Sequence, residues 1–379
     1  MWVVAVIAGV LVVMTGWLPW HDVVALTDRT TPVLAFLVGI TVVAELADQA
    51  QVFQRAARHA ARLGRGNARR LFWWIALLGS LTTIVLSLDT TAVLLTPVVL
   101  TMAQDADIDP LPFALLAVWL ANTASLLLPV SNLTNLLAVR TLGYSPEEFA
   151  RRMALPELVA VLGTAILLSF AYRRRLRILY VTQPAPAIED RTLFGVASFV
   201  CLAFIPLFIL GIPVEWPALG GAVTLVGAFA WRRRSALRIS LIPWRTVLLV
   251  AGLFLLVQAA SKHFLGQWLG DASGHSGSPL GTLRTVGVGA VASNALNNLP
   301  TYLAVEPAAM ATHRQLLGLL LGTNIGPLIT VWGSLATLLW RQRCKARNVH
   351  IGARQFGLIG LVGAIPLLLA TWATLLLST

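Results

Sequence analysis

The chain has 379 residues, of which 57% are hydrophobic and only 12% are charged, and its mean hydropathy is +0.79. A soluble protein of this length would have too few charged residues to cover its surface, so the composition predicts a polytopic membrane protein. The net charge of +12 does not indicate a nucleic-acid partner, because most of the 28 Lys and Arg residues stand in short clusters between apolar runs.

The apolar runs predict an all-α fold. Several approach or exceed the roughly 20 residues that a helix needs to cross about 30 Å of hydrocarbon. No alternating ten-residue pattern predicts a barrel. The first run lacks the basic start and small-residue cleavage site of a signal peptide, so we expect it to be a span. The expected spanning helices lie at about residues 2–20, 32–50, 112–139, 154–171, 195–211, 216–231, 246–262, 315–340 and 355–376.

Four basic clusters lie between these spans, at residues 51–70, 173–177, 231–238 and 341–354. The positive-inside rule places such clusters in the cytoplasm. We therefore expect a protein of the cytoplasmic (inner) membrane with its N-terminus in the cytoplasm. The two apolar stretches left over, 71–101 and 283–305, must then begin and end on one side, so each is predicted to be a re-entrant hairpin. An arm of roughly 15 residues at 1.5 Å each reaches about 22 Å into the bilayer.

The order of these elements repeats along the chain. One hairpin enters from the cytoplasm and the other from outside, so we expect two inverted-topology repeats, which secondary transporters use to build a central site with alternating access. The first repeat is residues 1–171, with hairpin 71–101 and broken helix 112–139; residues 172–215 form a cytoplasmic loop and linker helix; the second repeat is residues 216–379, with hairpin 283–305 and broken helix 315–340.

Polar side chains interrupt both broken spans. The runs "PVSNLTN" (129–135) and "GPLITVWGSLAT" (326–337) each join a proline to Ser, Thr or Asn residues. Irregular backbone at membrane depth is tolerated only where protein buries it or where it lines a wet cavity. Together with the hairpin motifs "SLDTTAVLLTP" (87–97) and "SNALNNLPTYL" (293–303), these runs predict a polar site at the middle of the membrane. The alternative is that the polar residues only hold helices together.

The same motifs carry a resemblance to a known family. They resemble the membrane subunits of arsenite/antimonite efflux pumps (arsenical pump membrane protein), within the ion transporter superfamily, which also holds sodium/dicarboxylate symporters and sodium/proton antiporters. The segments that carry it are "TVVAELADQAQVF" (41–53), "SLDTTAVLLTPVVL" (87–100), "ANTASLLLPVSNLTNLLAV" (121–139), "GYSPEEFARRM" (143–153), "NALNNLPT" (294–301) and "GTNIGPLITVWGSLATLLW" (322–340). The resemblance implies proton-coupled efflux of arsenite or antimonite. The alternatives are a sodium-coupled symporter of a dicarboxylate or other small anion, and a sodium/proton antiporter.

Carried over position by position, the resemblance implies a binding site between the hairpin tips and the helix breaks. Its residues are Asp89, Thr90 and Thr91 at the first tip, Ser131, Asn132, Thr134 and Asn135 in the first break, Asn297 and Asn298 at the second tip, and Thr323, Asn324, Gly333, Ser334 and Thr337 in the second break.

Asp89 is the residue that we expect to carry the coupling ion. An intramembrane carboxylate is costly and is a functional hypothesis by default, so Asp89 would carry a proton or hold sodium. The alternative is a protonated carboxyl that caps the second hairpin arm. Glu45 and Asp48 lie on one turn near the cytoplasmic end of the second span, where a proton path and interfacial capping are both open.

We expect no cofactor and no metal site. Cys201 and Cys344 lie outside the expected site, so arsenite would be held as a neutral hydroxylated species through hydrogen bonds. The sequence lacks a GxxxxGK[S/T] loop, so any ATPase that drives export is a separate soluble subunit. The resemblance also makes a homodimer plausible.

An intramembrane enzyme is the distant alternative. The motif "GHSG" (274–277) is similar to the nucleophile motif of intramembrane serine proteases, but it lies in a loop rich in glycine and serine. The six histidines all fall in loops or at span ends, so no histidine base is expected at membrane depth.

Overall fold

A computed structural model describes residues 2–181, 187–274 and 277–379. Within these ranges the chain is helical, and its one strand-like pairing is an isolated bridge between Asn67 and Leu179. His275 and Ser276 of the "GHSG" motif lie outside the described residues. Six of the described helices are long and apolar enough to cross a membrane, which agrees with the multi-pass membrane protein predicted from composition. They are Trp20–Gln49 (α2), Ala68–Leu86 (α4), Pro146–Ala171 (α9), Arg191–Phe208 (in α10), Ile239–His263 (containing α12) and Ala353–Ser378 (α18).

The first two helices differ from their predicted bounds. Helix α1 (Trp2–Met14) ends well before residue 20, and its 13 residues measure about 20 Å, which is shorter than the hydrocarbon core. Helix α2 begins at Trp20, so the predicted start at residue 32 was wrong, and Pro32 lies inside the helix. A helix also forms within the first basic cluster, α3 (Val52–Leu63), between the second predicted span and the first predicted hairpin.

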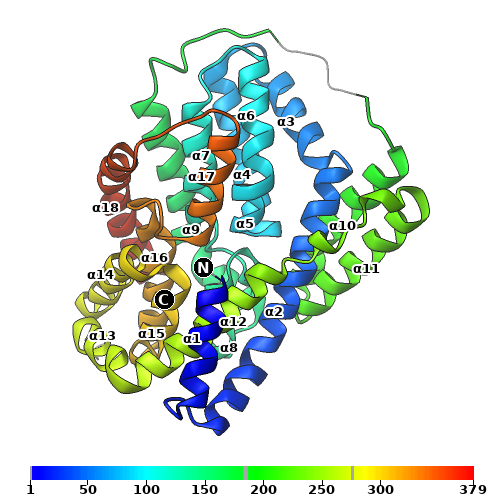
Figure 1. Ribbon diagram of the computed structural model, residues 1–379. Coiled ribbons are helices and arrows are strands. Elements are labelled where there is room, and N and C mark those ends of the chain that lie inside the picture. Colours follow the sequence, from blue (N-terminus) through cyan, green and yellow to red (C-terminus); the bar gives the residue numbers. More distant parts are fainter. Residues whose placement is uncertain (1, 182–186, 275–276) are drawn as a thin grey trace.

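Each of the two segments predicted to be re-entrant hairpins contains two helices joined by a sharp turn. In the first, α4 ends at Leu86, the chain reverses at Ser87, and it returns through α5 (Leu88–Thr90), the π-helical turn Thr91–Leu95 and α6 (Thr96–Asp105). In the second, α14 (Pro279–Leu296) and α15 (Asn298–Ala309) flank Asn297. The first hairpin lies in the upper half of the molecule and the second in the lower half (Figure 1). Their tips therefore approach each other from opposite sides.

The two tips share an uncommon backbone conformation. Ser87 has φ 114° and Asn297 has φ 84°, although neither is glycine. A non-glycine residue at positive φ costs on the order of 1–3 kcal/mol and persists only where the surrounding structure enforces it. The hairpin tips are therefore strained at matching positions.

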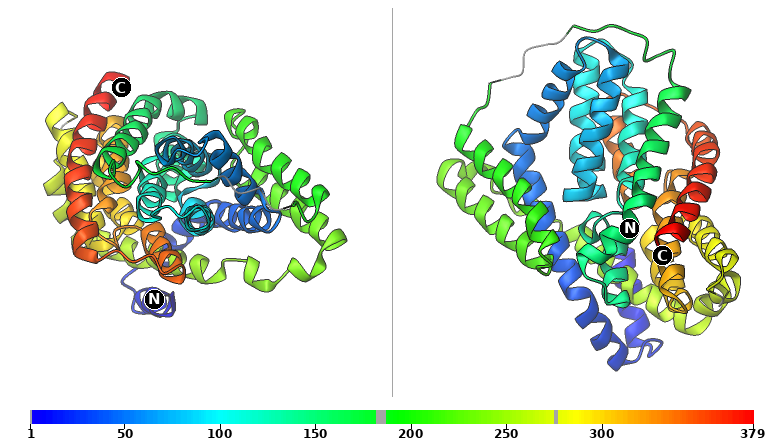
Figure 2. Two further views of the ribbon diagram at one scale, coloured as in Figure 1. Left: turned by 90° about the horizontal axis from the view of Figure 1, so that it is seen from above. Right: turned by 180° about the vertical axis from the view of Figure 1, so that it is seen from behind.

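The helical segments that cover residues 112–139 and 315–340 each contain a non-helical interruption. Helix α7 (Leu111–Thr123) is followed by an irregular segment with a 3₁₀ turn at Pro129–Ser131, and α8 (Leu133–Leu142) continues beyond it. Helix α16 (His313–Ile325) is followed by a 3₁₀ turn at Gly326–Leu328 and then by α17 (Leu335–Ala346). Helices α7 and α17 lie in the upper half and α8 and α16 in the lower half (Figures 1 and 2), so both breaks fall near mid-height.

Close helix packing occurs around small residues. Helix α1 packs on α12 (Trp244–Ala260) and α2 packs on α11 (Glu215–Arg232), while α9 packs on α18. A Cβ added at Gly39 of α2 would lie 2.7 Å from the carbonyl carbon of Ala218 in α11. One added at Gly252 of α12 would lie 2.6 Å from that of Ala5 in α1. Small residues let helix backbones approach closely in membranes, where dispersion rather than water exclusion drives packing.

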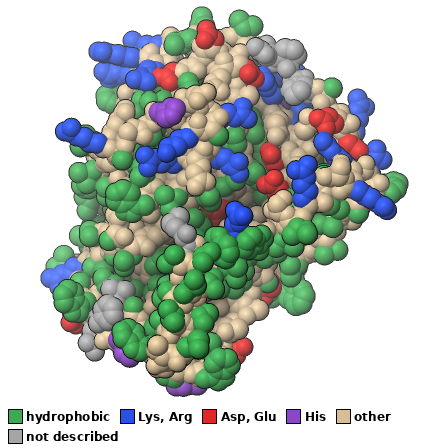
Figure 3. Space-filling model, in the orientation of Figure 1, with side chains coloured by type: hydrophobic (Ala, Val, Ile, Leu, Met, Phe, Trp, Pro, Cys, Tyr) green, Lys and Arg blue, Asp and Glu red, His purple; other side chains and the backbone are tan. Residues whose placement is uncertain are grey.

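Charged side chains are distributed unevenly over the surface. Lys and Arg gather over the upper half of the face in Figure 3, and hydrophobic side chains cover much of its lower part. At the upper side, Arg232 of α11 bonds to Asp190 at 2.6 Å, and Arg233 bonds to Glu189 at 2.9 Å, so the end of α11 lies beside the start of α10 (Arg191–Ile209). The Arg232 guanidinium lowers the pKa of the Asp190 carboxyl.

Candidate functional site

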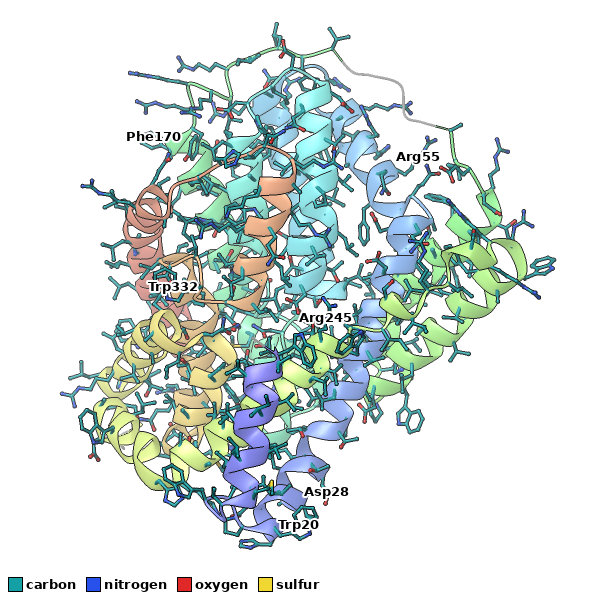
Figure 4. The ribbon with its side chains drawn as sticks, in the orientation of Figure 1. Trp20, Asp28, Arg55, Phe170, Arg245 and Trp332 are labelled. Carbon is teal, nitrogen blue, oxygen red and sulfur yellow. The ribbon has the colours of Figure 1, made fainter. Side chains whose placement is uncertain are left out.

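A cavity of about 540 Å³ lies where the hairpin tips meet the helix breaks. Figure 4 places Arg245 and Trp332 at mid-height, with Trp20 and Asp28 at the lower end and Arg55 and Phe170 toward the upper end. Trp332 lines the cavity, and Arg245 is the neighbour of its lining residue Thr246. Polar lining residues come from the first tip, the first break, the second tip and α12: Asp89, Asn132, Asn297, Asn298 and Thr246. The structure thus brings together the elements that the sequence motifs singled out.

Asp89 stands in this cavity without a protein partner. Its side chain is half-buried, and no hydrogen bond or ion pair joins it to another described residue. The expected alternative, a cap on the amide of Thr91 or Ala92, is not formed: the Thr91 amide bonds to the Ser87 carbonyl instead. A carboxylate at membrane depth without a partner is free to bind a proton, a cation or a hydroxylated ligand.

Asn324, in the second broken helix, holds the first break together. Its Oδ1 accepts hydrogen bonds from Asn132 Nδ2 at 2.6 Å and from Thr134 Oγ1 at 3.4 Å. Its Nδ2 donates to Asn135 Oδ1 at 3.3 Å. Asn135 in turn donates to the backbone carbonyls of Ser125 and Leu128, at 2.7 and 3.1 Å. The Asn135 amide thereby satisfies backbone carbonyls that the interruption of α7 leaves free, and of the four side chains only Asn132 also lines the cavity.

A similar contact joins the first broken helix to the second. Asn122, near the end of α7, donates to Thr337 Oγ1 at 3.4 Å, and Thr337 shares a 2.9 Å hydrogen bond with Ser334. Asn122 was not among the predicted site residues, although it stands in the "ANTAS" segment just before the break. Each break is therefore held by an asparagine from the other broken helix.

The second tip is anchored to the second break. Asn298 N donates to the Gly333 carbonyl at 2.9 Å, and Asn297 Nδ2 donates to the Trp332 carbonyl at 3.1 Å. The indole of Trp332 donates to the Asn294 carbonyl at 2.7 Å. Neither Trp332 nor Asn294 was predicted as a site residue, although Asn294 stands in the hairpin motif "SNALNNLPTYL" and Trp332 in the run "GPLITVWGSLAT".

Several predicted site residues support the tips and breaks instead of lining the cavity. Thr91 bonds to Thr83 at 2.8 Å, Thr90 to the Leu86 carbonyl at 3.2 Å, and Thr323 to the Leu319 carbonyl at 3.0 Å. Ser131 Oγ donates to the Ile84 carbonyl at 2.9 Å and so ties the first break to the first hairpin. All of these hydroxyls already have protein partners.

Glu45 and Asp48 lie apart from the cavity. Glu45 lines a polar pocket of about 370 Å³ with Arg233 and Arg238. Asp48 lines another, of about 240 Å³, together with Arg58. Neither pocket shares a lining residue with the central cavity, so the structure does not join this pair to the site.

A second carboxylate, which was not among the predicted site residues, lies at the first break. Glu157 of α9 is 4% exposed, and its Oε2 accepts a 2.9 Å hydrogen bond from the amide of Leu126. Its Oε1 has no hydrogen-bond partner. The signal was present, because Glu157 is a lone acidic residue in an apolar span, as Asp89 is. The carboxylate satisfies an amide that the unwound segment leaves without a helical partner.

The electrostatics of the cavity are simple. Among the described residues that line it, Asp89 is the one ionisable side chain, and none is Lys, Arg or His. Arg245 is exposed, and its guanidinium lies 5.2 Å from the centre of the Trp244 ring. The positive ends of α8 and α17 begin at cavity residues and add partial positive charge. The site suits a neutral hydroxylated solute or a cation next to a carboxylate.

The chain has known relatives over most of its length. Residues 1–318 match the family described as citrate transporter. The chain belongs to the citrate transporter family. It is therefore a secondary transporter, and its family consists of membrane transport proteins. The predicted resemblance to arsenite efflux pump subunits is confirmed. The chain is 29% identical to the arsenical pump membrane protein of Escherichia coli K12, over 98% of this chain and 92% of that protein.

Two further comparisons agree. An arsenical pump membrane protein of Yersinia enterocolitica is also 29% identical, over 98% of this chain and 92% of its own length. Among solved structures, the YdaH transporter of Alcanivorax borkumensis, described as having an unusual topology, superimposes with a TM-score of 0.58. The superposition covers 95% of this chain and 89% of the YdaH chain, at 14% sequence identity, which supports a shared fold.

Proposed function

We propose that the protein exports arsenite or antimonite from the cytoplasm in exchange for protons. The observation that carries the proposal is the unpaired carboxylate of Asp89 in a cavity that otherwise offers amides, a hydroxyl and apolar side chains. Near neutral pH arsenite is a neutral trihydroxide. Its hydroxyl groups can donate to Asp89 and accept from the amides of Asn132, Asn297 or Asn298.

The absence of net charge distinguishes arsenite from citrate as a substrate for this cavity. Citrate carries about three negative charges at neutral pH, and the described cavity lining would meet it with Asp89 and with no cationic side chain. A charge moved out of water without a counter-charge costs several kcal/mol. Helix N-termini offset part of that cost, typically 0.3–1 kcal/mol each. A neutral trihydroxide carries no such penalty.

Competition at Asp89 provides the coupling. An ionised Asp89 accepts a hydrogen bond from an arsenite hydroxyl, whereas a proton on the carboxylate removes that acceptor. Proton and substrate therefore exclude each other at one group, which is what an antiporter requires. The proton enters from the side where its concentration is higher and leaves to the other side as substrate binds.

Alternating access rests on the proposed inverted repeats, residues 1–171 and 216–379. Two matched features support them, one a pair of helix contacts and the other a pair of backbone angles. Gly39 packs on Ala218, and Gly252 packs on Ala5. The same number of positions separates the two glycines as separates the two alanines, so the contact recurs at equivalent places in the two repeats. The positive φ at Ser87 and Asn297 also recurs at equivalent tips. We further propose that the basic clusters and the N-terminus face the cytoplasm, which places the first hairpin on that side.

The test is arsenite uptake into everted membrane vesicles under an imposed proton gradient. Wild type should accumulate arsenite, and Asp89→Asn should lose the gradient-dependent part. Asp28→Asn is the matched control, because Asp28 is exposed at the lower end of the molecule (Figure 4) and should leave transport unchanged. Uptake that survives collapse of the gradient but needs ATP would point to a separate ATPase as the driving subunit. Absence of wild-type uptake, where a known exporter works in parallel, would refute arsenite as substrate and favour the sodium-coupled alternatives.

A further inference from the structure

A groove of about 390 Å³ lies between α3 and α10, away from the central cavity. One wall carries Arg55, His59 and Arg62 from α3, and the other carries Phe194, Cys201 and Leu202 from α10. Helices α3 and α10 are in contact. Figure 4 labels Arg55 in the upper part of the molecule, where the basic clusters lie. Its position suggests a role separate from transport.

The sequence of α3 explains the cationic wall. Residues 55, 59 and 62 are spaced four and three apart, which places them on one face of a helix. The opposite face carries Phe53, Ala57 and Ala60, which are buried against the rest of the protein. Gln51, with φ 67°, separates α3 from α2 and sets its direction. The basic face is thus turned outward by the burial of the apolar one.

The cations of this wall lack acidic partners. Arg55 and Arg62 form no ion pair with any described residue, whereas Arg58 on the neighbouring face pairs with Asp105 at 2.6 Å. Other arginines on the same side are also paired, including Arg232 and Arg233. An unmatched pair of guanidinium groups with an imidazole between them is suited to a phosphate.

The other wall belongs to a helix that is long and apolar enough to cross a membrane. Helix α10 is one of the apolar candidate spans, and Leu202 is 66% exposed while the neighbouring Phe199 is 71% exposed. From Phe194 to Leu202 the groove follows about 12 Å of helix into the hydrocarbon. The groove therefore joins a cationic end to an apolar, lipid-facing wall.

We propose that this groove binds an anionic phospholipid, with its phosphate between Arg55 and Arg62 and an acyl chain along Phe194 and Leu202. Basic pockets between membrane helices on the cytoplasmic side are a recurrent mode of anionic lipid recognition. The groove is lined by no residue of the central cavity, so the proposal is independent of the transported substrate.

The experiment compares lipid retention by the purified full-length protein, measured by native mass spectrometry from micelles doped with lipid. The probes are phosphatidylglycerol and phosphatidylcholine with identical chains. Wild type should prefer phosphatidylglycerol. The double variant Arg55→Gln/Arg62→Gln should bind this lipid on the order of tenfold less, because each of the two arginines adds to the attraction for the anionic headgroup. The charge-preserving double variant Arg55→Lys/Arg62→Lys should retain most of the binding, which separates loss of charge from misfolding.

The control is Arg69→Gln/Arg70→Gln, which removes two exposed arginines on the same side but outside the groove. It should retain the wild-type preference. Equal retention of both lipids by wild type, or equal loss in the control, would overturn the proposal. Displacement of phosphatidylglycerol by millimolar inorganic phosphate would also overturn it, because the groove would then be a site for free anions.

Discussion

A buried cluster that ties the second hairpin to the rest of the molecule gives a quantitative prediction. Glu306 of α15 forms an ion pair with Arg29 of α2. Its Oε1 also accepts hydrogen bonds from Thr141 Oγ1 of α8 at 2.6 Å and from Tyr302 at 3.0 Å. Replacing Glu306 with Gln keeps the shape and an acceptor oxygen, but it leaves the Arg29 guanidinium without its counter-charge.

The structure sets the size of the effect. Loss of one partner from a fully buried ion pair costs about 3–5 kcal/mol. The side chain of Glu306 is 3% exposed but that of Arg29 is 34% exposed, so solvent relieves part of the penalty. We therefore expect Glu306→Gln to destabilise the protein by about 2 kcal/mol. The double variant Arg29→Gln/Glu306→Gln removes both charges and should recover about 1 kcal/mol of that loss.

The assay is unfolding of the purified protein by SDS in mixed micelles, on wild type, both single variants and the double variant. Arg152 and Glu148 provide a comparison pair, four residues apart on α9 and 27% and 33% exposed. Its coupling energy should stay below about 0.5 kcal/mol. The reasoning is refuted if the Arg29–Glu306 coupling is no larger than that of this exposed pair.

Three further predictions use the same unfolding assay. Glu157→Ala should lower the free energy of unfolding by about 2 kcal/mol, because it leaves the buried Leu126 amide without an acceptor. Glu157→Gln should lower it by less than half as much. Equal losses in the two variants would contradict the hydrogen-bonding role. Gly360→Ala should lower the free energy of unfolding by about 3 kcal/mol or prevent folding, because its Cβ would overlap the Leu328 carbonyl oxygen. Gly227→Ala should change stability little, because there is open space around Gly227. Similar stability of the two variants would contradict the close approach at Gly360. Ser87→Gly should stabilise the first tip by about 1 kcal/mol because of its φ of 114°, and Ser87→Val should destabilise it; the opposite order would rule out strain at the tip.

The meeting of tips and breaks could be predicted from sequence because each has a local signature. A proline beside Ser, Thr and Asn inside an apolar run has few physical solutions in a membrane. Which of those residues line the cavity and which only support the helix break could not be predicted. Asn132 faces the cavity and Asn135 faces the break because of Asn324, which lies about 190 positions away.

The start of α2 was missed for a related reason. Residues 20–31 contain His21, Asp22, Asp28 and Arg29, which resemble a polar loop. In the folded protein two of these charges have partners far along the chain: Asp22 pairs with Lys262, and Arg29 pairs with Glu306. Long-range pairing therefore lets a helix continue through a segment whose composition predicts its end.

The most direct test of the proposed function compares arsenite with citrate in proteoliposomes that contain only the purified protein. A cavity whose one ionisable lining residue is Asp89 predicts uptake of arsenite driven by a proton gradient, with no citrate uptake and no inhibition of arsenite transport by excess citrate. Uptake of citrate, or competition by citrate for arsenite transport, would contradict the account and would assign the cavity to a carboxylate anion.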